Sequence, residues 1–318
     1  MAAPVSSEPV TGSAVSVAVV GTGRMGAAMA TRLCRAGHSV VAFNRSRDRV
    51  QTLASSLADA GGITVADTAR EAAAAADLVI SSLADDAAVE STYAGPDGLA
   101  AGLRPGAVVL ETSTIAPATV RAVAALVERA SGTLLDAPVS GSVPIVERGE
   151  LTFMVGGDAS AIERARPVLD VLGAKVFHMG GLGTGATMKL AVNAVVHALN
   201  QALAEALVLA ERAGVDREVA YEVFAASAIA APFVHYKKAA YLQPDETPVA
   251  FMLDLVAKDL ALIADLAESV DARMEQSATN RKLVLEALDA GLGSHDLSAL
   301  AVMLRGADAT SPPTSASP

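Results

Sequence analysis

The chain has 318 residues, which is enough for one large domain or two ordinary ones. Its net charge of −11 and its lack of a basic cluster exclude nucleic acid as an expected partner, and its long apolar runs all contain charges or chain breakers, so we expect no membrane-spanning helix. Cys34 is the single cysteine, and the first residues lack the basic start and apolar core of a secretion signal, so we expect a cytoplasmic protein without disulfides.

Short apolar runs alternate with helical patterns from residue 15 to residue 179. This alternation predicts an α/β fold with a doubly wound, mostly parallel sheet. Strands are expected at residues 15–20, 39–43, 78–83, 107–111, 133–137, 151–155 and 175–179, with a short one beginning near Val65. Helices are expected at residues 25–36, 47–57, 68–76, 117–130 and 161–172.

The alternation stops near residue 180, and only helical patterns follow, at residues 185–214, 216–227, 252–269, 273–290 and 298–304. Asp216 is a suitable N-cap for the second of these helices. The first is apolar on most sides, so we expect it to be buried. We therefore predict a nucleotide-binding domain at 15–180 and an all-α substrate and oligomerisation domain at 181–306, between disordered tails at 1–14 and 307–318.

A glycine-rich loop joins the first expected strand to the first expected helix, with the sequence Gly21-Thr22-Gly23-Arg24-Met25-Gly26. Gly21 allows a tight turn, Gly23 lets the backbone approach a pyrophosphate, and Gly26 lets the helix pack closely on the strand. The free N–H groups at the helix N-terminus favour the anion. In this context the loop predicts a Rossmann-type sheet that binds a dinucleotide, rather than a glycine turn without a ligand.

The end of the second expected strand selects the dinucleotide. An NAD site usually has an acidic residue about 20 residues after the glycine loop, where it accepts a hydrogen bond from the ribose 2′-OH. This chain has Asn44, Arg45 and Ser46 there. Arg45 can pair with a 2′-phosphate, and Asn44 and Ser46 can donate hydrogen bonds to it, so we favour NADP(H) over NAD(H). A solvated arginine beside a permissive NAD site is the alternative.

Two further loops follow strands and carry polar side chains. Ser113 and Thr114 lie where open α/β sheets bind ligands, and they can contact the cofactor or cap the next helix. Ser140 and the backbone beside Gly141 can hold a carboxylate or carbonyl oxygen. A serine in a turn is often no more than a turn residue, so this second loop is ambiguous by itself.

Lys189 and Asn193 interrupt the long apolar helix and share one face of it, about one turn apart. A lysine in a buried helix needs a partner or a shifted pKa. Reduction of a carbonyl requires a hydride and a proton, and an ammonium can donate the proton and stabilise the developing oxyanion. Asn193 can orient the lysine or the substrate. His197 lies one turn further on, and we interpret it as a packed, hydrogen-bonded histidine.

Four blocks of sequence resemble the β-hydroxyacid dehydrogenase family. That family includes 3-hydroxyisobutyrate dehydrogenase, tartronate semialdehyde reductase and the glyoxylate/succinic semialdehyde reductases. The blocks are residues 21–26, 136–141, 183–193 and 258–260, and the resemblance extends from about residue 17 to residue 304. It implies a Rossmann domain joined by a long helix to a helical domain, usually assembled as a homodimer or homotetramer.

The resemblance also implies roles for individual residues. Lys189 matches the family's catalytic lysine. Ser140, Gly141 and Asn193 match positions that hold the substrate carboxylate or hydroxyl. Thr114 and Lys258 match positions near the cofactor, and Lys258 can also face the substrate. We also expect Leu83 at the cofactor, and Ser142 and Phe233 at the substrate.

One departure from the family pattern indicates a branch. Many hydroxyisobutyrate-type members continue Ser-Gly-Gly, whereas Ser142 follows Gly141 here. Together with residues 44–46, this is closer to the glyoxylate/succinic semialdehyde reductase branch, which uses NADPH. Phe233 and the proline before it also resemble a substrate-pocket segment of that branch.

The favoured hypothesis is an NADPH-dependent reductase of a small aldehyde acid such as glyoxylate or succinic semialdehyde, reversible as a hydroxyacid dehydrogenase, with Lys189 as proton donor. Its substrate is a small carbonyl compound that carries a carboxylate, and the sequence shows no cluster of metal ligands. An imine reductase on the same scaffold is one alternative, although imine reductases usually carry another residue in place of this lysine. An NAD-dependent 3-hydroxyisobutyrate dehydrogenase and a catalytically silent NADPH-binding module are the others.

Overall fold

The computed structural model describes residues 14–306, so the expected tail at 307–318 and all but residue 14 of the expected tail at 1–14 lie outside the described residues. The chain divides into two compact units, one ending at Lys189 and one starting at Leu190. We call them the N-terminal unit and the helical unit. The division falls inside the long helix α9 (Thr184–Arg212), whereas the sequence places the boundary at 180/181.

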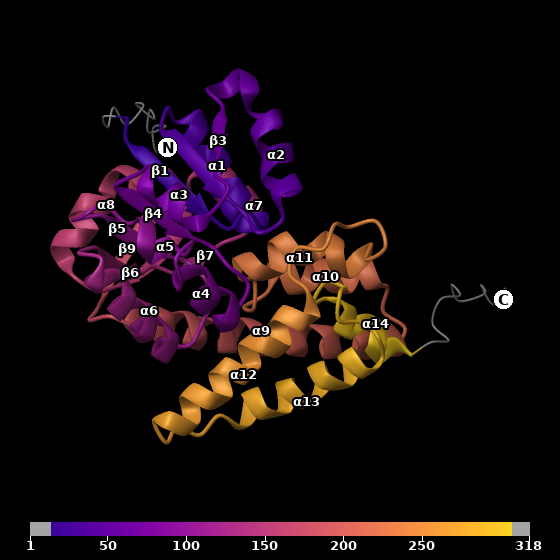
Figure 1. The fold of residues 1–318 in the computed structure, drawn as a ribbon. Helices are drawn as coiled ribbons and strands as arrows, with labels where there is room; N and C mark the ends of the chain where they lie inside the picture. The colour runs from indigo at the N-terminus through magenta and orange to yellow at the C-terminus, as the bar shows by residue number, and fades with distance from the viewer. Residues whose placement is uncertain (1–13, 307–318) are drawn as a thin grey trace, which may run out of the picture. The chain divides into compact units, whose positions relative to one another are not determined.

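The N-terminal unit is built on a nine-stranded sheet (Figure 1). The strand order is β3-β2-β1-β4-β5-β6-β8-β7, and β9 pairs with β8. Pairing is parallel from β3 through β6, β8 runs antiparallel to β6 and β7, and β9 is parallel to β8. This confirms the doubly wound, mostly parallel sheet. The strands are β1 (Ser16–Val20), β2 (Ser39–Phe43), β3 (Ile63–Val65), β4 (Leu78–Ser81), β5 (Val108–Glu111), β6 (Thr133–Asp136), β7 (Val139–Ser140), β8 (Leu151–Gly156) and β9 (Gly173–Gly180).

Helices cover both faces of this sheet, which explains why its central strands are apolar at nearly every position. Side chains of α1, α2, α7 and α8 form the core on one face, and those of α3 to α6 form it on the other. The helices are α1 (Arg24–Arg35), α2 (Arg47–Ser56), α3 (Ala69–Ala74), α4 (Asp86–Tyr93), α5 (Leu99–Gly102), α6 (Pro117–Arg129), α7 (Val143–Arg148) and α8 (Ala159–Leu172), with a 3-10 turn η1 (Ala58–Ala60).

Several short elements of the N-terminal unit are not predicted from the sequence. They are α4, α5, α7, the 3-10 turn η1 and the two-residue strand β7. Asp85 shows why a helix forms in what reads as a polar loop: its side chain accepts a hydrogen bond from Ala88 N at 2.8 Å and so caps α4. Elements this short carry too few apolar residues to show a clear period.

The helical unit contains most of α9 together with α10 (Arg217–Ala226), α11 (Pro232–Leu242), α12 (Leu253–Ser269), α13 (Glu275–Asp289) and α14 (Ala299–Arg305). It has its own apolar core. Asp216 caps α10 as expected, accepting from Val219 N at 3.0 Å. The sequence does not predict α11, because a proline begins it and two adjacent lysines interrupt its apolar pattern.

Helix α9 is less buried than its composition suggests. Within residues 14–306 it is the one helix that is long and apolar enough to cross a membrane, a test that core helices of soluble proteins also pass. We expect it to be buried, but Val195 is 69% exposed and Leu209 is 71% exposed. The expectation was wrong for one face, because an apolar composition does not say how many sides of a helix are covered.

Candidate active site

The glycine loop between β1 and α1 has the shape that a dinucleotide site requires. Gly21 has a φ of +94°, and a Cβ there would lie 2.3 Å from the carbonyl oxygen of Ser82. A Cβ on Gly26 would lie 2.0 Å from the carbonyl oxygen of Gly21. A Cβ on Gly23 would meet nothing within 4 Å, so this part of the backbone faces open space. Since no side chain caps α1 at Gly23, the N–H groups of its first turn are left for an anion.

Asn44 ties the end of β2 to this loop. Its Oδ1 accepts from Thr22 N at 3.0 Å, and its Nδ2 donates to the carbonyl oxygen of Ser46 at 3.0 Å. The amide is therefore engaged within the protein, whereas the sequence suggests a donor to a 2′-phosphate. Arg45 is exposed, and no ion pair to it occurs within residues 14–306. Arg45 is thus the positive charge that this strand end offers to a ligand.

The ends of β4 and β5 are joined beside the glycine loop. Ser113 Oγ accepts from Leu83 N at 2.8 Å. A Cβ on Gly21 would lie 2.9 Å from Leu83 Cδ2, so Leu83 borders the loop. The N-cap of α6 is Ala116, so the suggestion that Ser113 or Thr114 caps that helix is wrong. The serine hydroxyl instead fixes the neighbouring strand end.

Asp136 fixes the start of α9 at the end of β6. Its Oδ1 accepts from Gly183 N at 2.9 Å, and its Oδ2 accepts from Ala186 N at 2.8 Å. A Cβ on Gly185 would lie 2.5 Å from the carbonyl oxygen of Asp136, so the helix start needs glycine to approach the strand. Burial raises the pKa of Asp136, although the N–H groups of Ala186 and Gly183 act to lower it. Lys189 follows on the same helix, one turn after Gly185.

The end of β7 and the loop after it hold the two serines expected at the substrate. Ser140 is half-buried and pairs with Thr152 of β8. Gly141 has a φ of +143°, and a Cβ there would lie 2.7 Å from Leu151 Cδ2, so only glycine fits. Ser142 is the N-cap of α7, and its side chain makes no cap hydrogen bond. The pairing of β7 with β8 and the glycine at 141 therefore fix the backbone of this loop.

In the helical unit, polar residues of α9 and α12 converge on one carboxylate. Asn193 Nδ2 donates to Asp259 Oδ2 at 2.6 Å, and Lys258 Nζ lies 3.0 Å from Asp259 Oδ1. His197 Nε2 lies 3.5 Å from Asp259 Oδ2, which is within ion-pair range but longer than a normal N–H···O hydrogen bond. Burial acts to raise the pKa of Asp259, but interaction with His197 and the charge of Lys258 outweigh it and lower the pKa.

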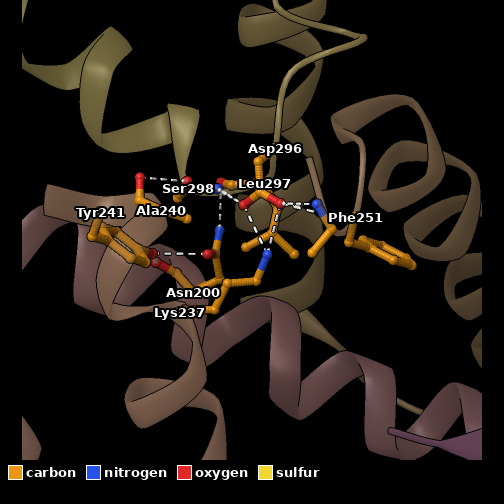
Figure 2. Close-up of polar contacts among 9 residues, drawn as sticks. Asn200, Lys237, Ala240, Tyr241, Phe251, Asp296, Leu297 and Ser298 are labelled. Carbon is orange, nitrogen blue, oxygen red and sulfur yellow. Dashed lines mark hydrogen bonds and ion pairs between the residues drawn. The ribbon is translucent and has the colours of Figure 1, made fainter. Parts of the chain in front are cut away.

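A second buried ion pair supports the segment before α12 (Figure 2). Lys237 Nζ of α11 donates to both carboxylate oxygens of Asp296, at 2.8 and 2.7 Å. Asp296 also accepts from the backbone N–H groups of Ala250, Phe251 and Ser298. Burial acts to raise the pKa of Asp296, but the Lys237 ammonium and the N–H groups of Phe251 and Ser298 lower it below its ordinary value. The pair therefore fixes the backbone at Phe251, whose ring lies against His197.

The remaining expected site residues lie in α1, after β5 and in α11. Arg24 and Met25 form the first turn of α1. Thr114 is half-buried after β5. Phe233, expected in the substrate pocket, is buried in the core of the helical unit and packs edge-on against Tyr236, with ring centroids 5.5 Å apart.

The strand order and the glycine loop define the class of protein. The order reverses between β1 and β4, and the glycine loop leaves β1 at that point, which is where doubly wound sheets bind dinucleotides. The open backbone at Gly23, the uncapped α1 and the exposed Arg45 fit such a ligand. The protein is a dinucleotide-binding protein of the Rossmann class.

Comparisons with known proteins identify the family. Residues 16–181 match the model of the NAD binding domain of 6-phosphogluconate dehydrogenase. Residues 183–304 match the model described as NAD-binding of NADP-dependent 3-hydroxyisobutyrate dehydrogenase. An NAD-dependent L-serine dehydrogenase from Pseudomonas aeruginosa is 36% identical over 289 residues, which cover 89% of this chain and 95% of that protein. The chloroplastic glyoxylate/succinic semialdehyde reductase 2 of Arabidopsis thaliana is 32% identical, over 92% of this chain and 80% of that protein.

A solved structure of Mycobacterium tuberculosis 3-hydroxyisobutyrate dehydrogenase with L-serine is also similar. It superposes with a TM-score of 0.78 at 33% identity, covering 92% of this chain and 99% of that one. The chain belongs to the β-hydroxyacid dehydrogenase family, the family of 3-hydroxyisobutyrate dehydrogenase. It is an NAD(P)-dependent oxidoreductase that acts on the CH–OH group of hydroxyacids.

Sequence reasoning missed the supporting roles of Asp136 and Asp259. In the sequence, both stand out only as members of the family blocks 136–141 and 258–260. A carboxylate at the end of an apolar strand, or inside an apolar helix, signals that a buried donor must be nearby. The donors lie 47 and 66 residues away in the sequence, so the signal does not identify them.

Proposed function

We propose that the protein is an NADPH-dependent reductase of a small aldehyde acid, such as glyoxylate or succinic semialdehyde, and that it also works in reverse as a hydroxyacid dehydrogenase. The observation that carries the proposal is the start of α9. Asp136 holds that start on the sheet that bears the glycine loop, and Lys189 follows one turn later. A proton donor is thereby built into the unit that binds the dinucleotide.

Each polar group has a task in this reaction. Bound NADPH supplies the hydride that reduces the carbonyl carbon. The Lys189 ammonium donates the proton to the carbonyl oxygen and stabilises the negative charge that develops there. Asn193 lies one turn further along α9, about 6 Å along its axis. Because its Nδ2 donates to Asp259, its Oδ1 is the atom left to accept from the ammonium or the substrate hydroxyl.

The substrate carboxylate is assigned to the loop after β7. Ser140 and the backbone N–H groups around Gly141 can donate hydrogen bonds to it. The protein carries a net charge of −11, so an anionic substrate is repelled at long range and depends on such local donors. Small aldehyde acids meet this requirement with one carboxylate and one reducible carbonyl.

Arg45 supports the choice of NADPH. It is exposed at the end of β2, where an NAD-specific site would have a carboxylate. A guanidinium can bind a 2′-phosphate through two hydrogen bonds, whereas it has no such partner in NADH.

A second candidate is the NAD⁺-dependent oxidation of a serine-like β-hydroxyacid. It is favoured by the 36% identity to an enzyme named NAD-dependent L-serine dehydrogenase and by the similarity to a structure solved with L-serine. The two candidates differ in cofactor and in substrate, so one set of assays separates them.

The test is a matrix of substrates and cofactors. NADPH or NADH oxidation is followed with glyoxylate, succinic semialdehyde, methylmalonate semialdehyde, tartronate semialdehyde and a cyclic imine. NADP⁺ or NAD⁺ reduction is followed with 3-hydroxyisobutyrate and L-serine. We expect the highest kcat/KM with NADPH and an aldehyde acid. A highest value with NAD⁺ and L-serine would favour the second candidate, and a highest value with the imine would refute both.

A further inference from the structure

His197 is a buried polar residue that the proposed reaction does not use. The residue is 4% exposed, and its ring lies against that of Phe251, with centroids 6.0 Å apart. Neither ring nitrogen has a partner at hydrogen-bond geometry within residues 14–306, so the expectation of a hydrogen-bonded histidine is wrong. A buried polar atom without a hydrogen bond costs about 1–3 kcal/mol, and Nε2 has only the 3.5 Å ion-pair contact with Asp259 Oδ2. Simple packing does not explain this histidine, because an apolar side chain would fill the space without that cost.

The imidazole is directed at the carboxylate that holds Asn193. His197 Nε2 lies 3.5 Å from Asp259 Oδ2, and the same oxygen accepts from Asn193 Nδ2 at 2.6 Å. His197 and Asn193 are one turn apart on α9, so they approach Asp259 from the same helix face. With Lys258 on the other oxygen at 3.0 Å, donors surround a carboxylate that is 1% exposed.

This arrangement fixes which way the Asn193 amide points. If the amide were flipped, its oxygen would lie 2.6 Å from a carboxylate oxygen, which is repulsive. The orientation of Asn193 therefore depends on where Asp259 Oδ2 lies. A carboxylate held only by Asn193 and Lys258 can rotate away from the amide. The imidazole of His197, which lies near Asp259 Oδ2, attracts that oxygen and so opposes the rotation.

We propose that His197 is a positioning residue that acts through Asp259 to hold the Asn193 amide, and hence its Oδ1, in the orientation that catalysis uses. The inference rests on the proposed function, because it assumes that Asn193 works in the active site. The ring contact with Phe251 holds the imidazole in turn, and the backbone of Phe251 is held by Asp296.

The experiment is a double-mutant cycle on the holoenzyme with its best substrate. His197→Leu removes the imidazole N–H, and His197→Gln restores an amide N–H at a similar reach. We expect His197→Leu to lower kcat on the order of tenfold, with NADPH binding unchanged and with His197→Gln recovering most of the loss. In an Asn193→Ala background, His197→Leu should cause almost no further loss, because the residue through which it acts is gone.

The control is Gln201→Leu. Gln201 is also buried on α9, one turn after His197, and also has a polar atom without a partner. We expect this variant to alter thermal stability but not kcat. If His197→Leu does not fold, His197→Met takes its place as the variant without a donor.

The outcomes separate this inference from the proposed function. Wild-type kcat in His197→Leu, no recovery in His197→Gln, or an undiminished His197→Leu loss in the Asn193→Ala background would overturn the positioning role alone. Full activity of Asn193→Ala would overturn the role of Asn193 in the proposed function, and the inference with it.

Discussion

Replacement of Asp136 by alanine tests whether this carboxylate anchors α9. It leaves Gly183 N and Ala186 N, which now donate at 2.9 and 2.8 Å, without an acceptor in a buried place. Each unsatisfied buried donor costs about 1–3 kcal/mol, so the loss in unfolding free energy should be about 2–6 kcal/mol. Because Lys189 is carried on the loosened helix start, kcat should also fall on the order of tenfold or more.

Urea unfolding followed by circular dichroism measures the first effect, and steady-state NADPH oxidation measures the second. Asp216→Ala is the matched control, because Asp216 also caps a helix but is exposed. It should cost about 1 kcal/mol and leave kcat unchanged. If Asp136→Ala cost no more than Asp216→Ala, or kept wild-type kcat, the anchoring role would be refuted.

Four further predictions concern the cofactor site and the buried ion pair. Arg45→Ala should weaken NADPH binding at least tenfold more than NADH binding in a fluorescence titration, since it removes a charge-assisted hydrogen bond, and equal losses would refute the 2′-phosphate assignment. Gly23→Ala should fold like wild type but lose NADPH affinity, because its Cβ points into the open space where the pyrophosphate is expected. Gly26→Ala should also lower Tm, because its Cβ would lie 2.0 Å from a carbonyl oxygen. Equal Tm losses in the two variants would contradict this prediction. Lys237→Met should cost about 3–5 kcal/mol in urea unfolding, because it leaves Asp296 buried without its cation, and a loss under 1 kcal/mol would contradict the structural role. The pKa of Asp296 is lower in the folded protein than in the unfolded chain, so the ionised carboxylate stabilises the fold above its unfolded pKa of about 3.9. This stabilisation should be lost as the pH falls through the folded pKa. Asp296→Asn should remove that part of the decrease in unfolding free energy at acid pH.

The doubly wound, mostly parallel sheet could be predicted because each central strand is a short apolar run followed by a helical pattern, whereas the strand order comes from the structure. The strand bounds in the structure differ from the expected ones by few residues. Short or interrupted elements could not be predicted. Helix α11 begins with Pro232 and contains Lys237, which becomes compatible with the core only through Asp296, 59 residues later. Such pairing is a property of the fold and leaves no periodic signal.

The candidate site also contains features that the sequence predicts and features that it does not. The glycine loop could be predicted because its residues are contiguous and each glycine is required by the local backbone geometry. The partners of Asp136 and Asp259 could not, since they come from distant parts of the chain. His197 shows a third case: the sequence predicts a packed and hydrogen-bonded residue, and the structure confirms only the packing.

The central claim is that Lys189 donates the proton in reduction of an aldehyde acid. The most direct measurement is kcat of Lys189→Ala on the best substrate, with the Kd for NADPH determined on the same protein. Loss of a general acid typically costs about 10²–10⁴-fold, so we predict a kcat loss in that range with a nearly unchanged Kd. Wild-type kcat in Lys189→Ala, with NADPH bound normally, would contradict the account.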